Sequence, residues 1–262
     1  MDINIKGKVA LVCGASQGIG KAIAEQFASS GAKVILLARS QEKLQALVDN
    51  LNKKTETNHL YISCDLSNLE DLERKVQEIL NQIGTIDILV NNTGGPPPGK
   101  LYLSEAEQLE IAFRQHILSA QKLISLLVPG MIENKFGRII NVVSVGMREP
   151  IENLGVSNTI RGAMGSWAKT LSKELGPFGI TVNNILPGYT LTERLKSLIQ
   201  QRANEKQISF EEEASSIIAK IPAKRFALPE EIGYLAAFLA SDFASYINGA
   251  SIPVDGGFLS GI

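Results

Sequence analysis

Residues 14–20 read GASQGIG and follow the apolar run KVALVC at residues 8–13. The run is typical of a buried strand, and Gly14, Gly18 and Gly20 allow the chain to turn tightly before an amphipathic segment. A strand, a glycine-rich turn and a helix in this order direct backbone N–H groups and a helix N-terminus at an anion. The stretch therefore predicts a dinucleotide-binding turn, with the spacing G-x-x-x-G-x-G in place of G-x-G-x-x-G.

Apolar runs and helical segments alternate along the rest of the chain. The segment KAIAEQFASSG at residues 21–31 is typical of these helices and should stop at Gly31. Runs that are apolar throughout indicate strands covered on both faces, so we expect an α/β fold with a parallel sheet. The expected strands are residues 8–13, 33–38, 59–64, 86–90, 137–143, 181–186 and 250–254.

Composition indicates a globular protein without a nucleic-acid or membrane partner. The 262 residues are 44% hydrophobic and 20% charged, and the net charge is −1. No linker divides the chain, so we expect one domain over residues 1–262. Scattered charges do not form a nucleic-acid surface, and the first apolar run is too short for a signal peptide or a membrane span. We therefore expect a cytoplasmic protein.

Cysteines and histidines are few. Cys13 and Cys64 each end an expected strand, which indicates two free, partly buried thiols and not a disulfide. His59 and His116 stand far apart, so no metal site is expected.

Residues 192–222 interrupt the alternation with a charged, weakly helical segment. Ser209 and Glu212 have the spacing of a capping box, so a helix should begin there. An insertion after a late strand tends to lie over the carboxyl edge of an α/β sheet, where ligands bind. We interpret the segment as a lid, and a surface helical hairpin is the alternative.

The end of the second expected strand indicates which dinucleotide binds. An acidic residue there would accept the ribose hydroxyls of NAD, but this chain has Ala38, Arg39 and Ser40. A guanidinium can hold the 2′-phosphate of NADP, so NADP(H) is favoured over NAD. The alternative is that Arg39 is a solvated charge at the start of the next helix. Asp65, which follows the third strand, would hold an adenine amino group.

Six motifs occur in order over nearly the whole chain: GASQGIG at 14–20, CDL at 64–66, NNTGG at 91–95, INVVS at 140–144, PGYTLT at 187–192 and GASIPVDGG at 249–257. Together they resemble the short-chain dehydrogenase/reductase family, in particular its β-ketoacyl-carrier-protein reductases. The resemblance implies a doubly wound Rossmann domain with a seven-stranded sheet and a nicotinamide cofactor. It also implies a carbonyl or alcohol substrate and a homotetramer or homodimer.

The resemblance also implies roles for individual residues. Ser144 matches a serine that orients the substrate, and Asn91 matches an asparagine that steadies the central sheet. Thr192 matches a threonine beside the nicotinamide amide. The residues expected at the cofactor are Gly14, Ser16, Gln17, Gly18, Ile19, Gly20, Arg39, Ser40, Asp65, Leu66, Asn92, Gly94, Arg161, Pro187, Gly188, Thr190 and Thr192.

Three positions of the family's catalytic set differ in this chain. The catalytic tyrosine and lysine of the family fall on Ser157 and Arg161, and the asparagine of the preceding long helix falls on His116. Cys13 also replaces a threonine ahead of the glycines. The resemblance therefore leaves open which group gives the proton that carbonyl reduction needs.

Four residues are candidates for the missing chemistry. Ser157 is too short and too weakly acidic to replace a phenol, whose pKa is about 10. Arg161 can hold the nicotinamide ribose but cannot relay protons. His116 can act as the acid, directly or through water, unless it is a structural histidine. Tyr189 is a second candidate donor unless it only packs under the lid.

Two loops are expected to shape the substrate pocket. GGPPPGK at residues 94–100 should be stiff, because its three prolines fix their own φ angles. Arg148, Glu149 and Arg194 lie on loops that the family folds over substrate, where two arginines can hold an acidic group. Solvated loop charges are the alternative.

The sequence thus predicts an NADP(H)-dependent oxidoreductase acting on a carbonyl or alcohol, with catalytic candidates Ser144, Ser157, Arg161, His116 and Tyr189. Two alternatives remain open. One is an NADP(H)-binding protein without redox turnover, such as a sensor or an assembly subunit. The other is non-redox chemistry on the same fold, such as dehydration.

Overall fold

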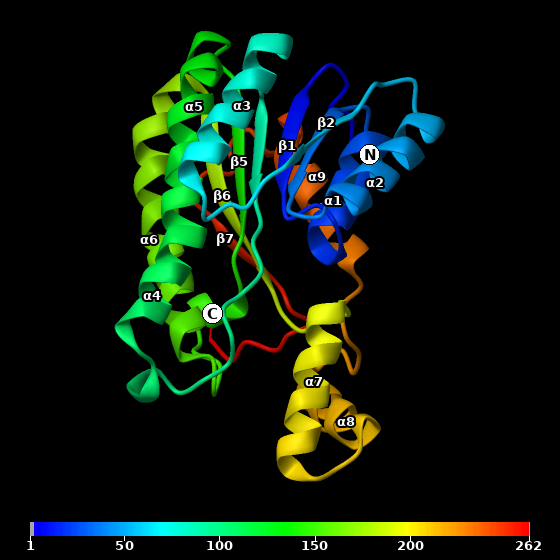
Figure 1. The fold of residues 1–262 in the computed structure, drawn as a ribbon, viewed down its shortest axis with the longest axis vertical. Coiled ribbons are helices and arrows are strands. Elements are labelled where there is room, and N and C mark those ends of the chain that lie inside the picture. Colours follow the sequence, from blue (N-terminus) through cyan, green and yellow to red (C-terminus); the bar gives the residue numbers. More distant parts are fainter. Residues whose placement is uncertain (1–2, 262) are drawn as a thin grey trace.

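Seven parallel strands form a single sheet in the computed structural model, which describes residues 3–261 (Figure 1). The strand order is β3-β2-β1-β4-β5-β6-β7, and every neighbouring pair is parallel. This confirms the doubly wound sheet, and each expected strand is present with its ends within two residues of the prediction. The strands are β1 (Val9–Cys13), β2 (Lys33–Ala38), β3 (Leu60–Ser63), β4 (Ile88–Asn91), β5 (Gly137–Val142), β6 (Ile180–Pro187) and β7 (Ser251–Val254).

Helices cover both faces of the sheet because its strands are apolar on both sides. Leu11 and Val12 of β1 are both fully buried, yet they belong to different core clusters on opposite faces. Val12 shares its cluster with α1 (Gly18–Ser29), α2 (Gln41–Lys54) and α9 (Pro229–Ala240). Leu11 shares its cluster with α3 (Leu69–Ile83), α5 (Ser119–Glu133) and α6 (Gly155–Leu175).

The helix before α5 is continuous with it but changes its winding. α4 (Ala106–Phe113) passes into one π-helical stretch, η2 (Arg114–Leu118), and then into α5. Such a bulge rotates the side chains that follow it, and bulges of this kind occur often at functional sites. His116 lies on it.

The strand order reverses direction between β1 and β4, and this reversal leaves a crevice at the carboxyl ends of these strands. The chain leaves β1 toward β2 and β3 on one side, and then crosses to β4 on the other side. Loops that follow β1 and β4 therefore diverge, which is where open α/β sheets bind ligands. The first of these loops contains the glycine-rich turn, and α1 ends at Ser29, just before Gly31 with φ of +92°, as the sequence predicts.

Two regular helices occupy most of residues 192–222, so the segment is more helical than expected. α7 (Glu193–Lys206) and α8 (Phe210–Lys220) project together from the body of the molecule (Figure 1). The apolar side chains Leu195, Ile199, Ile217 and Ile221 are buried against one another, which offsets the charge on the outer faces. The capping box of Ser209 and Glu212 is confirmed.

Both cysteines are free and lie deeper than expected. Cys13 is 1% exposed and Cys64 is 4% exposed. Burial raises the pKa of each thiol to about 12, so both stay protonated and unreactive near neutral pH.

Residues 3–261 contain neither a helix long and apolar enough to cross a membrane nor a cluster of side chains suited to hold a metal ion.

Candidate active site

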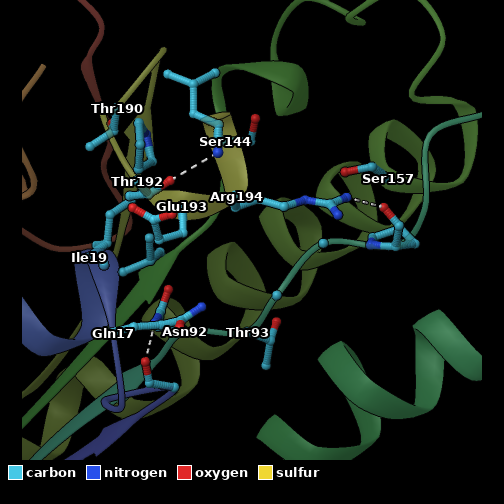
Figure 2. Close-up of a pocket in the computed structure, with 18 of the residues that line it drawn as sticks. Gln17, Ile19, Asn92, Thr93, Ser144, Ser157, Thr190, Thr192, Glu193 and Arg194 are labelled. Atoms are coloured by element: carbon cyan, nitrogen blue, oxygen red, sulfur yellow. Dashed lines mark hydrogen bonds between the residues drawn. The ribbon is translucent and has the colours of Figure 1, made fainter. Parts of the chain in front are cut away.

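A pocket of about 560 Å³ opens at the carboxyl edge of the sheet (Figure 2). It is lined by the segments that follow six of the strands, β1 to β6, together with residues of α6 and α7. Every residue expected at the cofactor lines it except Gly20. Of the catalytic candidates, Ser144, Ser157, Arg161 and Tyr189 line the pocket, whereas His116 does not.

The glycine-rich turn forms one end of the pocket. Gly14 and Gly18 have φ of +61° and +56°, a conformation that side chains rarely adopt. Gly20 is buried behind the turn, where a Cβ would lie 2.3 Å from the carbonyl oxygen of Gly14. This geometry supports close packing of α1 on the turn as the role of Gly20, which does not line the pocket.

The N-terminus of α1 is open to an anion. Gln17 is its N-cap but makes no side-chain capping hydrogen bond, and the first turn holds no acidic residue. Gln17, Gly18 and Ile19 line the pocket, and the first N–H groups of a helix have no partner within the helix, so this end of α1 is suited to bind an anion. The Asn92 side chain donates to the carbonyl oxygens of Cys13 and Gly14, at 3.2 and 3.4 Å, and fastens the turn to the end of β4.

Cationic side chains stand beside the turn. Arg39 is exposed and lies 4.0 Å from Asp65, with Ser40 between it and α2. Lys43, in the first turn of α2, also lines the pocket and donates a 3.3 Å hydrogen bond to Gln17. Lys43 was not predicted from the sequence, although its position four residues after Arg39 is the signal that would have suggested it.

Ser144 and Ser157 bring hydroxyl groups to the middle of the pocket (Figure 2). The Ser144 oxygen accepts a 3.0 Å hydrogen bond from the N–H of Gly146, so its own O–H remains available as a donor. Ser157 and Arg161 are four residues apart on α6 and therefore share one face of it.

Arg161 is a buried cation in the pocket lining. Its side chain is 8% exposed, and its Nη1 donates a 3.1 Å hydrogen bond to the carbonyl oxygen of Val142. Burial lowers the pKa of Arg161 to about 10, so the group is still charged at neutral pH. Within residues 3–261 no carboxylate lies within 4.0 Å of this guanidinium. An unpaired buried charge beside a pocket is typical of a ligand site.

His116 lies behind this arrangement. It is 4% exposed, borders a separate small cavity, and forms a short hydrogen bond between its Nδ1 and the Thr93 hydroxyl. Burial, and then the charge of Arg161, lower the pKa of His116 to about 3. The imidazole is therefore neutral at physiological pH and outside the main pocket. Its position fits the structural alternative and does not support the expected role as the acid.

Tyr189 follows β6 and lines the pocket. Its ring packs edge-on against Phe258, with centroids 5.3 Å apart, and lies 6.4 Å from the Phe226 ring. Tyr189 is the one tyrosine among the pocket-lining residues, and within residues 3–261 its hydroxyl has no hydrogen-bond partner.

Thr192 connects the glycine-rich turn with the start of α7. It is the N-cap of α7, and its hydroxyl accepts from the N–H of Leu195 at 3.2 Å. Its methyl carbon stands 3.2 Å from the place where a Cβ of Gly18 would lie. The base of α7 is thus in contact with the turn.

Backbone hydrogen bonds hold the C-terminal end of the loop of residues 94–100. The N–H of Gly99 donates to Asn153 at 2.8 Å, and the N–H of Gly155 donates to Gly99 at 2.9 Å. These hydrogen bonds fix the loop against the start of α6, which adds to the stiffness expected from its prolines.

Of the charged loop residues, only Arg194 reaches the pocket. It donates a 2.9 Å hydrogen bond to the carbonyl oxygen of Pro96. Arg148 instead bonds the carbonyl oxygen of Ser251 at 2.7 Å, and Glu149 accepts from the N–H of Ser260 at 3.2 Å. The expectation that Arg148 and Glu149 face the substrate is therefore wrong, because these bonds direct both side chains toward the C-terminal segment. Arg202 of α7 takes a place in the lining that was not predicted.

The chain is similar to known proteins along nearly its whole length. A family model described as enoyl-(acyl carrier protein) reductase matches residues 14–259. The chain is 33% identical over 256 residues to the NADPH-dependent reductase BacG of Bacillus subtilis, covering 97% of this chain and 99% of that protein. It is also 36% identical over 257 residues to the 3-oxoacyl-[acyl-carrier-protein] reductase FabG of Vibrio cholerae. That match covers 97% of this chain and 98% of the relative. The structure of L-sorbose reductase from Gluconobacter frateurii, complexed with NADPH and L-sorbose, superposes with a TM-score of 0.94 at 32% identity over 100% of both chains.

Proposed function

The chain belongs to the short-chain dehydrogenase/reductase family, and from this premise we propose that it is an NADP(H)-dependent carbonyl reductase whose proton comes from a group other than the family's usual tyrosine. The observation that carries the proposal is the shared pocket of the glycine-rich turn, Ser144, Ser157 and Arg161. The family's tyrosine and lysine positions hold Ser157 and Arg161.

The cofactor end of the pocket fits NADP(H). Gly14 and Gly18 provide the close backbone approach, and the uncapped N-terminus of α1 would bind the pyrophosphate. Arg39 and Lys43 would hold the 2′-phosphate, which distinguishes NADP(H) from NAD(H). When bound, NADPH supplies the hydride that the carbonyl carbon accepts.

The side chains of the pocket must then stabilise the negative charge that develops on the carbonyl oxygen and supply the proton that this oxygen finally accepts. The free O–H of Ser144 would donate a hydrogen bond to this oxygen and fix the carbonyl. Arg161, held by Val142 through one nitrogen, keeps its other N–H groups for the ribose hydroxyls of the cofactor. Its positive charge also favours the developing negative charge at this poorly solvated end of the pocket.

We assign the proton to Tyr189. A phenol is a far stronger acid than the Ser157 hydroxyl. Tyr189 lines the pocket, and its hydroxyl has no hydrogen-bond partner within residues 3–261. His116 cannot serve as an imidazolium donor near neutral pH, because its pKa is about 3. Water ordered between Ser144 and Ser157 is the alternative source of the proton.

The test has two steps that separate binding from turnover. Calorimetry of the folded protein should show tight binding of NADPH and weaker binding of NADH. Spectrophotometry with a broad panel of carbonyl and alcohol substrates should then show a substrate-dependent change in reduced nicotinamide. Tight NADPH binding with silence across the panel would instead support a binding protein without redox turnover, such as a sensor or an assembly subunit.

We also propose a single-domain cytoplasmic protein that assembles as a homotetramer or homodimer. The two core clusters share one sheet, which supports a single domain. Exposed apolar side chains gather on η1 (Leu101–Leu103) and α4, which supports a covered surface in an assembly. They are Leu101, Tyr102, Leu103, Ile111 and Phe113. Light scattering coupled to size-exclusion chromatography would give the mass, and a monomer would contradict this part.

A further inference from the structure

The substrate end of the pocket carries an excess of positive charge. Arg161, Arg194 and Arg202 line it against a single carboxylate, that of Glu193, which is paired with Lys196 at 2.7 Å. Throughout residues 3–261, no acidic side chain lies within 4.0 Å of any of the three guanidinium groups. A cleft lined by charges of one sign concentrates ligands of the opposite sign, so this end of the pocket is suited to an anion.

Arg194 is positioned at this end by a defined contact. In Figure 2 its side chain extends from the start of α7 across the pocket, toward Ser157 and the segment that follows Thr93. Nη2 donates to the carbonyl oxygen of Pro96 at 2.9 Å, which sets the direction of the guanidinium but leaves its charge unpaired. A planar guanidinium held in this way retains N–H groups for a carboxylate.

Arg202 lies further along the same helix and also lines the pocket. Leu195, Leu198 and Arg202 follow one another at helical spacing on α7, and all three line the pocket. Arg202 is partly buried, and Leu195 and Leu198 give this part of the lining an apolar surface. Ile151 and Leu154 add apolar surface from the segment before α6. The site therefore combines positive charge with a hydrophobic wall.

The cofactor groups are already assigned to cationic residues other than Arg194 and Arg202. It is anchored to Val142 at the floor of the pocket and is assigned to the ribose of the cofactor. The 2′-phosphate of NADP(H) is assigned to Arg39 and Lys43 at the opposite end, next to the glycine-rich turn. Arg194 and Arg202 are thus left for a second anion, one that belongs to the substrate.

We propose that the substrate is an oxo acid with an apolar body, whose carboxylate is bound by Arg194 and Arg202 while its carbonyl faces Ser144. The choice of a carbonyl rests on the proposed function, whereas the anion site follows from the arginines alone. α7 would then contribute to substrate specificity as well as to covering the pocket.

The test measures binding, so that it does not depend on turnover. Protein saturated with NADP⁺ is titrated by calorimetry with hexanoate and, separately, with hexanamide, which has the same body without the charge. Hexanoate should bind at least about tenfold more tightly, since hydrogen bonds to charged groups are the stronger kind. The double variant Arg194→Gln/Arg202→Gln should reduce this preference to near parity. Lys220→Gln, which removes one exposed charge from α8 outside the pocket lining, should retain it.

The remaining outcomes separate the two proposals. Equal binding of the acid and the amide, binding of neither, or a preference that survives the double variant would overturn the anion site. A marked loss of NADPH affinity in the double variant would also overturn it, because these arginines would then belong to the cofactor site. An intact acid preference with no turnover of oxo acids or of any other member of the carbonyl and alcohol panel would refute the proposed redox function and leave the anion site standing.

Discussion

The guanidinium of Arg161 donates a 3.1 Å hydrogen bond to the carbonyl oxygen of Val142, and this bond ties α6 to the end of β5. The contact fixes a buried positive charge in the pocket that Ser144 and Ser157 also line. It also makes Arg161 both a structural residue and a candidate for catalysis, so experiments must distinguish the two roles.

Arg161→Met should lower kcat about 10²-fold, because it removes the charge and donors that face the developing oxyanion. It should also lower the free energy of unfolding by about 1–3 kcal/mol, since the Val142 carbonyl loses its partner. Steady-state kinetics and urea denaturation measure the two effects. Arg161→Lys keeps the charge and should recover part of the rate. A purely structural role predicts lost stability in Arg161→Met with kcat unchanged in the folded fraction.

Tyr189→Phe should lower turnover by about 10²- to 10⁴-fold, the range expected when a general acid is removed. NADPH affinity should change little, and ring packing against Phe258 should be retained. Tyr61→Phe is the matched control, because Tyr61 does not line the pocket. Full activity of Tyr189→Phe would contradict the assignment of Tyr189 as the proton donor and would favour water ordered at Ser144 and Ser157.

Arg39→Ala should weaken NADPH binding about 10- to 100-fold, because charge-assisted hydrogen bonds to the 2′-phosphate are lost. NADH binding should stay the same or improve slightly, so the ratio of the two dissociation constants is the informative quantity. Lys43→Ala should shift that ratio in the same direction by a smaller amount. An unchanged ratio in both variants would show that Arg39 is only a solvated charge.

His116 should make stability depend on pH in a defined direction. Its pKa is about 3 in the folded chain against 6.5 for an unperturbed histidine. Between these values the unfolded chain binds the proton and the folded chain does not, so stability is lost as the pH falls from 6.5 toward 3. Relative to His116→Asn, the wild-type protein should lose up to about 1.4 kcal/mol per pH unit in that window.

Urea denaturation at several pH values between 7 and 5 measures this difference. His59 is present in both proteins, so its own contribution cancels. Parallel stability curves for the two proteins would show that His116 is not held neutral by the fold.

Gly20→Ala should destabilise the protein by several kcal/mol or prevent folding, because the new Cβ would lie 2.3 Å from the carbonyl oxygen of Gly14. Gly162→Ala on the exposed side of α6 is the control, since no atom lies within 4 Å of the added carbon. That control should be neutral or stabilise by up to about 1 kcal/mol, because alanine favours the helix. Similar thermal midpoints for both variants would contradict the packing argument.

The sequence by itself determined the strands, the glycine-rich turn and the family. Each of these depends on local chemistry: an apolar run such as residues 8–13 is buried on both faces wherever it is placed in a parallel sheet. Gly14 and Gly18 mark a turn because their φ angles of +61° and +56° suit few other residues. Arg39 could be placed at the pocket because its position is set by the end of β2 alone.

Only the tertiary structure decided which polar side chains share the pocket and how they are charged. His116 was a plausible acid until the packing around η2 showed its burial and its closeness to Arg161, and these set its pKa. Arg148 and Arg194 look alike in sequence, yet Arg148 bonds to Ser251 outside the pocket lining, whereas Arg194 bonds to Pro96 within it. Lys43 and Arg202 reach the pocket through the faces of α2 and α7 that the packed fold turns toward it. Burial, pKa and side-chain direction arise from neighbours distant in the chain, and no local pattern specifies them.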